Sequence, residues 1–217
     1  MKIKTNLESI KKQIPPSVEL VVVSKNRTLD EVQEVVDNGI TNLGENRVQQ
    51  LLSKYDNIKG DVNWHFIGHL QTNKVKYIID KVCLIHSVDS LKLAQEIQRQ
   101  SVKHDKITDI LIQINVSKEK SKYGINIEEY EDFLESLKQM KNINVKGLMT
   151  IAPYTEKIEE TRYIFSELKE IYDKIKINEI AYFNVEMKTL SMGMTNDYLI
   201  AIDEGSNMIR VGRGVFE

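Results

Sequence analysis

The stretch Leu20-Val21-Val22-Val23-Ser24-Lys25 decides how this chain folds. Four consecutive apolar residues, three of them β-branched, end abruptly at a hydroxyl and a lysine. So short and continuous an apolar run is typical of a strand that is buried on both faces, as in a parallel sheet. Lys25 therefore stands at the carboxyl end of a predicted buried strand.

Similar runs recur along the 217 residues, separated by longer segments with helical periodicity. The predicted strands cover residues 20–23, 41–44, 64–67, 82–85, 110–115, 145–149, 189–192 and 208–211. Eight strands that alternate with helices favour a closed (β/α)8 TIM barrel of the α/β class over an open doubly wound sheet. No Ser/Gly-rich linker interrupts the chain, so we expect residues 1–217 to form a single domain.

Helix-capping signals occur between these strands. Thr28 with Glu31 forms a capping box, and Asn126 with Glu129 has the same spacing. Asp89 and Thr195 are predicted to cap two further helices. The segment 7–14 has apolar residues at helical spacing and is expected to cover the gap where the last strand meets the first. Too few residues follow the last strand to predict another helix.

Composition excludes several classes of function. Thirty basic and 32 acidic residues give a net charge of −2, so no nucleic-acid partner is expected. No apolar run approaches the roughly 18 residues that span a bilayer, and the N-terminus lacks a signal-peptide core, so no membrane partner is expected. The single cysteine, Cys83, can form no internal disulfide and is predicted to be a small core residue. A cytoplasmic location is the expectation.

The active face of such a barrel collects the carboxyl ends of its strands. Lys25 would point into the barrel mouth, where desolvation favours the neutral amine that adds to carbonyls. The alternative is a lysine that merely reaches out to solvent. Two glycine-containing stretches, Ser191-Met192-Gly193 and Arg210-Val211-Gly212, lie at the ends of the last two strands, where barrels often bind phosphate. These are either a phosphate site or ordinary turns. Together the features predict a phosphorylated carbonyl ligand, either a cofactor or a sugar phosphate.

The histidines do not predict a metal site. His65 and His69 lie four residues apart, but on an apparent strand this spacing separates them by about 13 Å at about 3.3 Å per residue. No third ligand with suitable spacing is present. The charged loop 117–124 is interpreted as solvated.

The residues also resemble a known family, the pyridoxal phosphate homeostasis proteins, also called the YggS or PROSC family. The resemblance rests on ordered motifs: Val21-Val22-Val23-Ser24-Lys25, Gly44-Glu45-Asn46-Arg47-Val48-Gln49, Trp64-His65-Phe66-Ile67-Gly68-His69-Leu70-Gln71-Thr72-Asn73-Lys74, Ser121-Lys122-Tyr123-Gly124, Gly147-Leu148-Met149, Leu190-Ser191-Met192-Gly193-Met194-Thr195 and Ile209-Arg210-Val211-Gly212. It implies a fold like the N-terminal barrel domain of alanine racemase.

The resemblance implies that Lys25 holds pyridoxal 5′-phosphate as a Schiff base and that Arg210 faces the pyridine nitrogen. The other cofactor-binding residues it implies are Ser191, Gly193 and Gly212 at the phosphate, Asn46 near the cofactor and Lys122 on a loop implicated in cofactor exchange. Two positions depart from the family pattern. Arg213 stands where the family often has Thr or Ser, which removes a hydroxyl contact to phosphate, and Leu43 replaces a common Phe.

Two functions follow from this resemblance. The first is a carrier and buffer of the cofactor, without robust catalysis, that supplies apo-enzymes dependent on pyridoxal phosphate. The alternative is an enzyme with weak amino-acid racemase activity. Two-base racemisation needs a second proton-transfer group, which alanine racemase takes from a further domain and a partner subunit. We therefore expect a monomer with no established catalytic residue and no metal. A third hypothesis is a Schiff-base aldolase that uses the same barrel, without the cofactor, to act on a sugar phosphate.

Overall fold

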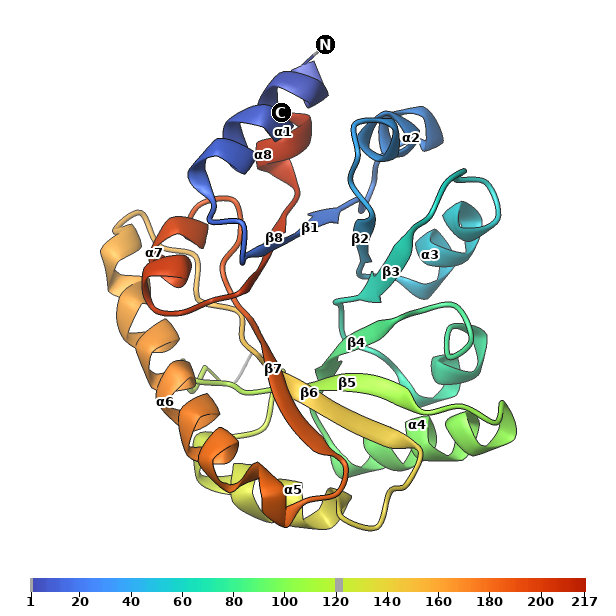
Figure 1. Cartoon of the computed structure of the whole chain (residues 1–217), viewed down its shortest axis with the longest axis vertical. Coiled ribbons are helices and arrows are strands. Elements are labelled where there is room, and N and C mark those ends of the chain that lie inside the picture. The colour runs from blue at the N-terminus through green and yellow to red at the C-terminus, as the bar shows by residue number, and fades with distance from the viewer. Residues whose placement is uncertain (1, 120–122) are drawn as a thin grey trace.

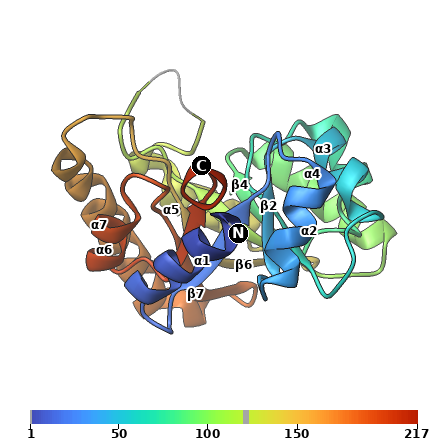
Figure 2. The same cartoon turned by 90° about the horizontal axis from the view of Figure 1, so that it is seen from above.

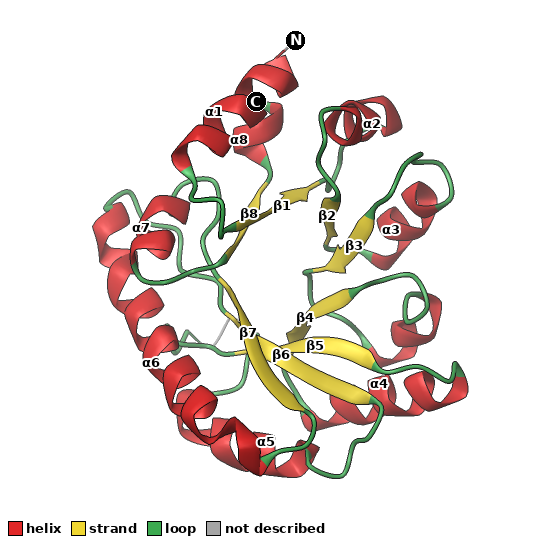
Figure 3. Cartoon of the chain, in the orientation of Figure 1, coloured by secondary structure: helices red, strands yellow, loops and turns green. Residues whose placement is uncertain are grey.

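The computed structural model describes residues 2–119 and 123–217, in which eight parallel strands pair in chain order and close on themselves. The strands are β1 Glu19–Val23, β2 Asn42–Glu45, β3 Asn63–Phe66, β4 Leu84–Val88, β5 Thr108–Gln113, β6 Ile143–Met149, β7 Val185–Ser191 and β8 Met208–Val211. Pairing of β1 with β8 closes the ring. Figure 1 and Figure 3 show the strands as an inner ring with the helices outside it. The predicted (β/α)8 TIM barrel is confirmed.

Helices connect the strands along the outside of the ring. The α-helices are α1 Lys2–Gln13, α2 Leu29–Asp37, α3 Val48–Tyr55, α4 Leu91–Lys103, α5 Tyr130–Leu137, α6 Arg162–Asn178, α7 Tyr198–Asp203 and α8 Arg213–Phe216. Shorter 3₁₀ helices are η1 Thr72–Tyr77, η2 Ile127–Glu129, η3 Ile158–Thr161 and η4 Glu179–Ala181. Within the described residues no helix is both long enough and apolar enough to cross a membrane.

The capping box that starts α2 is confirmed. The Glu31 N–H donates to Thr28 Oγ1 at 3.2 Å, and the Thr28 N–H donates to Glu31 Oε2 at 2.8 Å. The second bond favours the ionised carboxyl, so it lowers the pKa of Glu31. The ionised Glu31 carboxylate thus stabilises the first turn of α2.

The other capping predictions are wrong in detail. Ser90 rather than Asp89 caps α4, because Ser90 Oγ accepts the Leu93 N–H. Thr195 lies ahead of α7, and its hydroxyl accepts the Gly214 N–H instead. Asn126 bonds to the Glu129 side chain, but its own side chain caps no backbone group.

Helices α1 and α8 lie side by side and cover the junction of β8 with β1 (Figure 1 and Figure 2). Leu7 and Ile10 of α1 are buried there, as predicted for the segment 7–14. The expectation that no helix follows β8 is wrong, since Arg213–Phe216 form one turn that buries Val215 and Phe216. The Asn6 side chain joins the two helices by donating to Val215 O at 3.0 Å.

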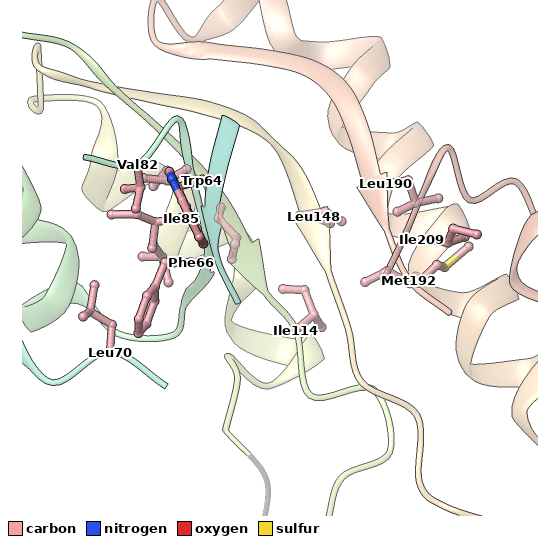
Figure 4. Close-up of a cluster of buried hydrophobic side chains, with 14 of the residues drawn as sticks. Trp64, Phe66, Leu70, Val82, Ile85, Ile114, Leu148, Leu190, Met192 and Ile209 are labelled. Carbon is pink, nitrogen blue, oxygen red and sulfur yellow. The ribbon is translucent and has the colours of Figure 1, made fainter. Parts of the chain in front are cut away.

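Alternation along each strand divides the core into two parts. A large cluster lies between the sheet and the helices, and Figure 4 shows Leu190, Met192 and Ile209 within it. A small apolar cluster consists of Val21, Leu84, Leu111, Met149 and Met208. Successive side chains of a strand point to opposite faces, so Arg210, next to Ile209, points into the barrel.

Strand β4 begins two residues later than predicted, at Leu84. Cys83 therefore precedes the strand and is exposed, so its predicted place in the core is wrong. Its thiol donates to Trp64 O at 3.3 Å. Burial of part of the side chain raises the pKa of the Cys83 thiol to about 11, which leaves it protonated and unreactive at neutral pH.

Strands β6 and β7 approach each other closely at Gly147, which has φ +151°. A Cβ atom there would lie 1.7 Å from Thr189 O. We expect Gly147→Ala to lower the free energy of unfolding by about 3–5 kcal/mol, because backbone atoms must move apart and φ is strained.

The matched control is Gly39→Ala, where φ is also positive, at +79°, but no atom lies within 4 Å of the added Cβ. That change should cost only about 1–2 kcal/mol. Urea unfolding of both variants measures the difference. Equal costs for the two would contradict the close approach of β6 and β7.

Candidate functional site

A cavity of about 560 Å³ opens at the carboxyl end of the barrel. Its walls come from residues that end or follow β1, β2, β3, β6, β7 and β8. Apolar side chains such as Ile67, Ile151 and Ile158 form much of the lining. Lys25, Asn46 and Arg210 supply polar groups to the lining. This is the face where barrels of this type place their ligands.

Lys25 stands on a fixed turn at the rim of the cavity. Arg27 N donates to Ser24 O at 3.1 Å, and Asn26 adopts a left-handed φ of +59°. Gln50 holds this conformation with two bonds, accepting from Asn26 N at 3.3 Å and donating to Asn26 Oδ1 at 2.8 Å. Among the described residues the Lys25 amine has no hydrogen bond or ion pair. It is an exposed primary amine held beside an apolar wall.

A buried charged cluster lies directly behind Lys25. Glu45, which is fully buried, accepts from Ser24 Oγ at 2.8 Å and from Lys54 Nζ at 2.5 Å. Lys54 Nζ also donates to Ser24 O. Lys54 on α3 thus links Glu45, at the end of β2, to Ser24, the residue that follows β1 and precedes Lys25. Charge pairs out of water hold geometry well, because separating them is costly.

Two turns bound the cavity on the side of β7 and β8. Gly193 has φ +91°, and a Cβ there would lie 2.6 Å from Ala201 Cβ, so only glycine fits. The Gly214 N–H donates to Thr195 Oγ1 at 3.3 Å and joins the turns. Within the described residues, no hydrogen bond uses the backbone N–H of Thr195, Asn196, Gly212 or Arg213. These free N–H groups, together with the guanidinium of Arg213 in the same lining, suit an anion such as phosphate.

Arg210 is a buried cation at the floor of the cavity. Its Nη1 donates to Ser191 Oγ at 2.6 Å and its Nη2 to Thr150 O at 2.8 Å. Burial lowers the pKa of Arg210 to about 10, and the nearby Asp197 charge opposes that shift. No ion pair of the described residues includes Arg210. A buried guanidinium with only neutral partners favours a ligand that presents an acceptor.

Asp197 is fixed locally rather than paired with Arg210. Its carboxylate accepts the Met194 N–H at 2.6 Å, in the turn after β7. Desolvation raises the pKa of Asp197, and this bond opposes the rise. Asp197 therefore shapes the turn that borders the cavity.

Four of the seven predicted site residues line this one cavity, namely Lys25, Asn46, Arg210 and Gly212. Asn46 Oδ1 is buried and has no hydrogen-bond partner in the part of the chain that the structure describes. Gly193 lies in the adjoining turn. Ser191 ends β7, and its hydroxyl is fully buried inside the barrel, where it bonds to Arg210, so it does not line the cavity. Lys122 lies outside the described residues.

Two features of the site were missed by sequence reasoning. Lys54 is the first, although it shares the buried face of α3 with Val48 and Leu51, which is an available signal. The second is that His65 lies inside the barrel, 2.9 Å from the His86 ring, while His69 is exposed and stacks on Tyr123. The structure therefore separates His65 from His69.

We expect Lys54→Met to lower the free energy of unfolding by about 3–5 kcal/mol, because the Glu45 carboxylate is left buried without its partner. Combining it with Glu45→Gln should restore most of that loss. The control is Lys188→Met, which removes an exposed ion pair with Glu186 and should cost less than about 1 kcal/mol. Urea denaturation of the four proteins tests this. A double variant as unstable as the single one would refute the pairing.

Comparison with known proteins places this site in context. The whole chain, residues 1–217, matches the family model described as alanine racemase, N-terminal domain. The pyridoxal phosphate homeostasis protein of Aquifex aeolicus is 42% identical over 198 residues, or 91% of this chain and 85% of that protein. The structure of PipY from Synechococcus elongatus, with PLP bound, is 31% identical with a TM-score of 0.90, covering 99% of this chain and 100% of that one. Alanine racemase of Clostridium difficile, at 17% identity and a TM-score of 0.76, shares the fold over 99% of this chain and 56% of its own.

Proposed function

The chain belongs to the alanine racemase N-terminal domain family and, within it, to the pyridoxal phosphate homeostasis proteins, and from this we propose that it binds pyridoxal phosphate through Lys25 as a carrier and buffer of the cofactor. One observation carries the proposal. Among the described residues, an amine without a partner stands in the same cavity as a buried guanidinium and a set of free backbone N–H groups.

The residues of the cavity match the chemical parts of this cofactor. Lys25 Nζ can bond covalently to an aldehyde, and Asn46 Oδ1 is a buried acceptor without a partner. The free N–H groups beside Gly193 and Gly212 can bind the phosphate. Arg213, which replaces a hydroxyl residue of the family pattern, adds positive charge there. The cavity therefore fits the group.

Arg210 suits the pyridine nitrogen of the cofactor. When bound, pyridoxal phosphate supplies an aldehyde and a ring that withdraws electrons. A guanidinium beside the ring nitrogen keeps that nitrogen unprotonated and so weakens the withdrawal. This favours storage over catalysis. In this assignment Ser191 acts through Arg210 rather than on the phosphate, and Lys122 retains its proposed part in cofactor exchange.

The contents of the cavity also favour a carrier over a racemase. Racemisation needs two proton-transfer groups on opposite faces of the substrate. Among the described residues, the titratable side chains on the walls are Lys25, Tyr154, Asp197, Arg210 and Arg213. Asp197 is bonded to the backbone, and Tyr154 is 79% exposed. Water-exposed chemistry of this kind is poorly controlled.

The proposal extends to the setting of the protein. We place it in the cytoplasm as a monomer that delivers the cofactor to apo-enzymes dependent on pyridoxal phosphate. A single cysteine and a near-neutral net charge support an aqueous, reducing compartment without a nucleic-acid partner.

Incubation with pyridoxal phosphate should produce a visible absorption band that borohydride removes, with the added mass confined to the peptide containing Lys25. Lys25→Ala should abolish both, since it removes the amine. Lys92→Ala, an exposed lysine on α4, serves as the control and should behave like the native chain. Labelling spread over several lysines, or labelling of Lys25→Ala at the native level, would refute the assignment.

The carrier role is tested by following single-enantiomer amino acids in deuterated water with the loaded protein. We expect no exchange at Cα beyond that of free cofactor, because Asp197 is bonded to the backbone and Tyr154 is largely exposed, so neither is placed as a second base. Proton NMR of the amino acid measures it. Rapid exchange that disappears in Lys25→Ala would establish an enzyme instead.

A further inference from the structure

A continuous chain of side-chain hydrogen bonds crosses the interior of the barrel below the cavity. We call this chain, formed by Arg210, Ser191, His86 and His65, the file. Arg210 Nη1 donates to Ser191 Oγ, which lies 3.1 Å from His86 Nδ1. His86 Nε2 lies 2.9 Å from His65 Nδ1. The four residues come from β8, β7, β4 and β3, and none is more than 4% exposed. The file therefore joins strands on opposite sides of the ring.

The file ends at a second cavity, at the amino end of the barrel. This cavity, of about 410 Å³, is lined by His65 together with residues that begin the strands, such as Glu19, Asn63 and Asp109. His65 Nε2 is buried and has no partner. The last group of the file is thus a buried polar atom that lacks a partner among the described residues, on a residue that lines the cavity.

The direction of the bonds follows from the chemistry of the groups. A guanidinium only donates, so Ser191 Oγ accepts from Arg210 and has its own hydrogen to give. Within the described residues its other partner is His86 Nδ1, which must then accept. Burial lowers the pKa of His65 to about 4 and that of His86 well below its usual value, so both rings are neutral. His86 therefore carries its proton on Nε2 and donates to His65 Nδ1, and His65 carries its proton on Nε2.

The opposite direction satisfies fewer groups. If His86 Nδ1 carried the proton, Ser191 Oγ would accept twice and its hydrogen would have no acceptor in the interior. A buried hydroxyl hydrogen without an acceptor costs about 1–3 kcal/mol. The direction from Arg210 towards His65 is therefore the stable one.

From this arrangement we infer that Ser191, His86 and His65 are positioning residues that hold Arg210 towards the cofactor cavity, and that each group donates to the next in the order Arg210, Ser191, His86 and His65. Each bond presents its acceptor towards Arg210, so the file stabilises the buried cation without a carboxylate. His65, the last residue of the file, lines the same cavity as Glu19 and Asp109, and Lys146 and Lys188 on that cavity are paired with Glu186.

The tautomers can be measured without cofactor. In ¹⁵N-histidine NMR of the cofactor-free protein, His65 and His86 should both be neutral Nε2–H rings between about pH 6 and 8. Their Hε2 protons should exchange slowly, and His65→Gln and His86→Gln should assign the signals. A charged ring, or an Nδ1–H tautomer for either residue, would overturn the inference whatever the fate of the proposed function.

The second measurement rests on the proposed function, because it reads bound pyridoxal phosphate. His86→Phe should weaken cofactor retention about tenfold and shift the absorption spectrum, since Ser191 loses an acceptor. His86→Gln, whose amide both accepts and donates, should restore most of the native behaviour. His104→Phe, on an exposed histidine, is the control.

The outcomes separate the two ideas. Native affinity and an unchanged spectrum in His86→Phe would refute the file while leaving the carrier intact. Failure of the native chain to bind pyridoxal phosphate would refute the carrier, and the NMR result would still decide the file. If His86→Phe does not fold, His65→Phe and the NMR measurement on the native chain carry the test.

Discussion

The parallel pairing of β1 with β8 is the constraint on which the rest of the structure depends. It places Val21 opposite Arg210 and closes the ring. Val22 pairs with Val211, so the carboxyl ends of β1 and β8 lie at the same edge of the barrel. Lys25 and Gly212 therefore line the same cavity, although 187 positions separate them in the chain. A short α8 and the long α1 cover the outside of this junction. The site therefore depends on closure of the barrel. If β1 and β8 separated, Lys25 would no longer lie in the same cavity as Arg210 and Gly212.

Buried charge is managed in two ways around the cavity. Behind Lys25, Glu45 and Lys54 form an ion pair that fixes the rim and leaves Lys25 free. Below the cavity, Arg210 has only neutral partners, and a file of polar side chains replaces a counter-ion. A paired charge keeps a fixed geometry, whereas an incompletely satisfied one attracts a ligand. The two arrangements therefore give the proposed carrier a fixed rim and a buried cation that is open to a ligand.

Short apolar runs predicted every strand, because a buried parallel strand needs apolar side chains on both faces. The family resemblance singled out Lys25, Asn46, Arg210 and Gly212, and the structure has all four in the lining of one cavity. Ser191 lies within the predicted strand and at the end of β7, and its hydroxyl is buried in the barrel against Arg210. The bond between His86 and Ser191 joins residues 105 positions apart, and no local pattern encodes such a contact.

The most direct test of the central claim is transfer of cofactor from the loaded protein to an apo-enzyme, in the presence of a scavenger that removes free aldehyde. Activity of the recipient enzyme reports the transfer. The account predicts that activity returns with the loaded native chain and not with Lys25→Ala treated in the same way. Recovery that is absent with the native chain, with or without the scavenger, would contradict a carrier of pyridoxal phosphate.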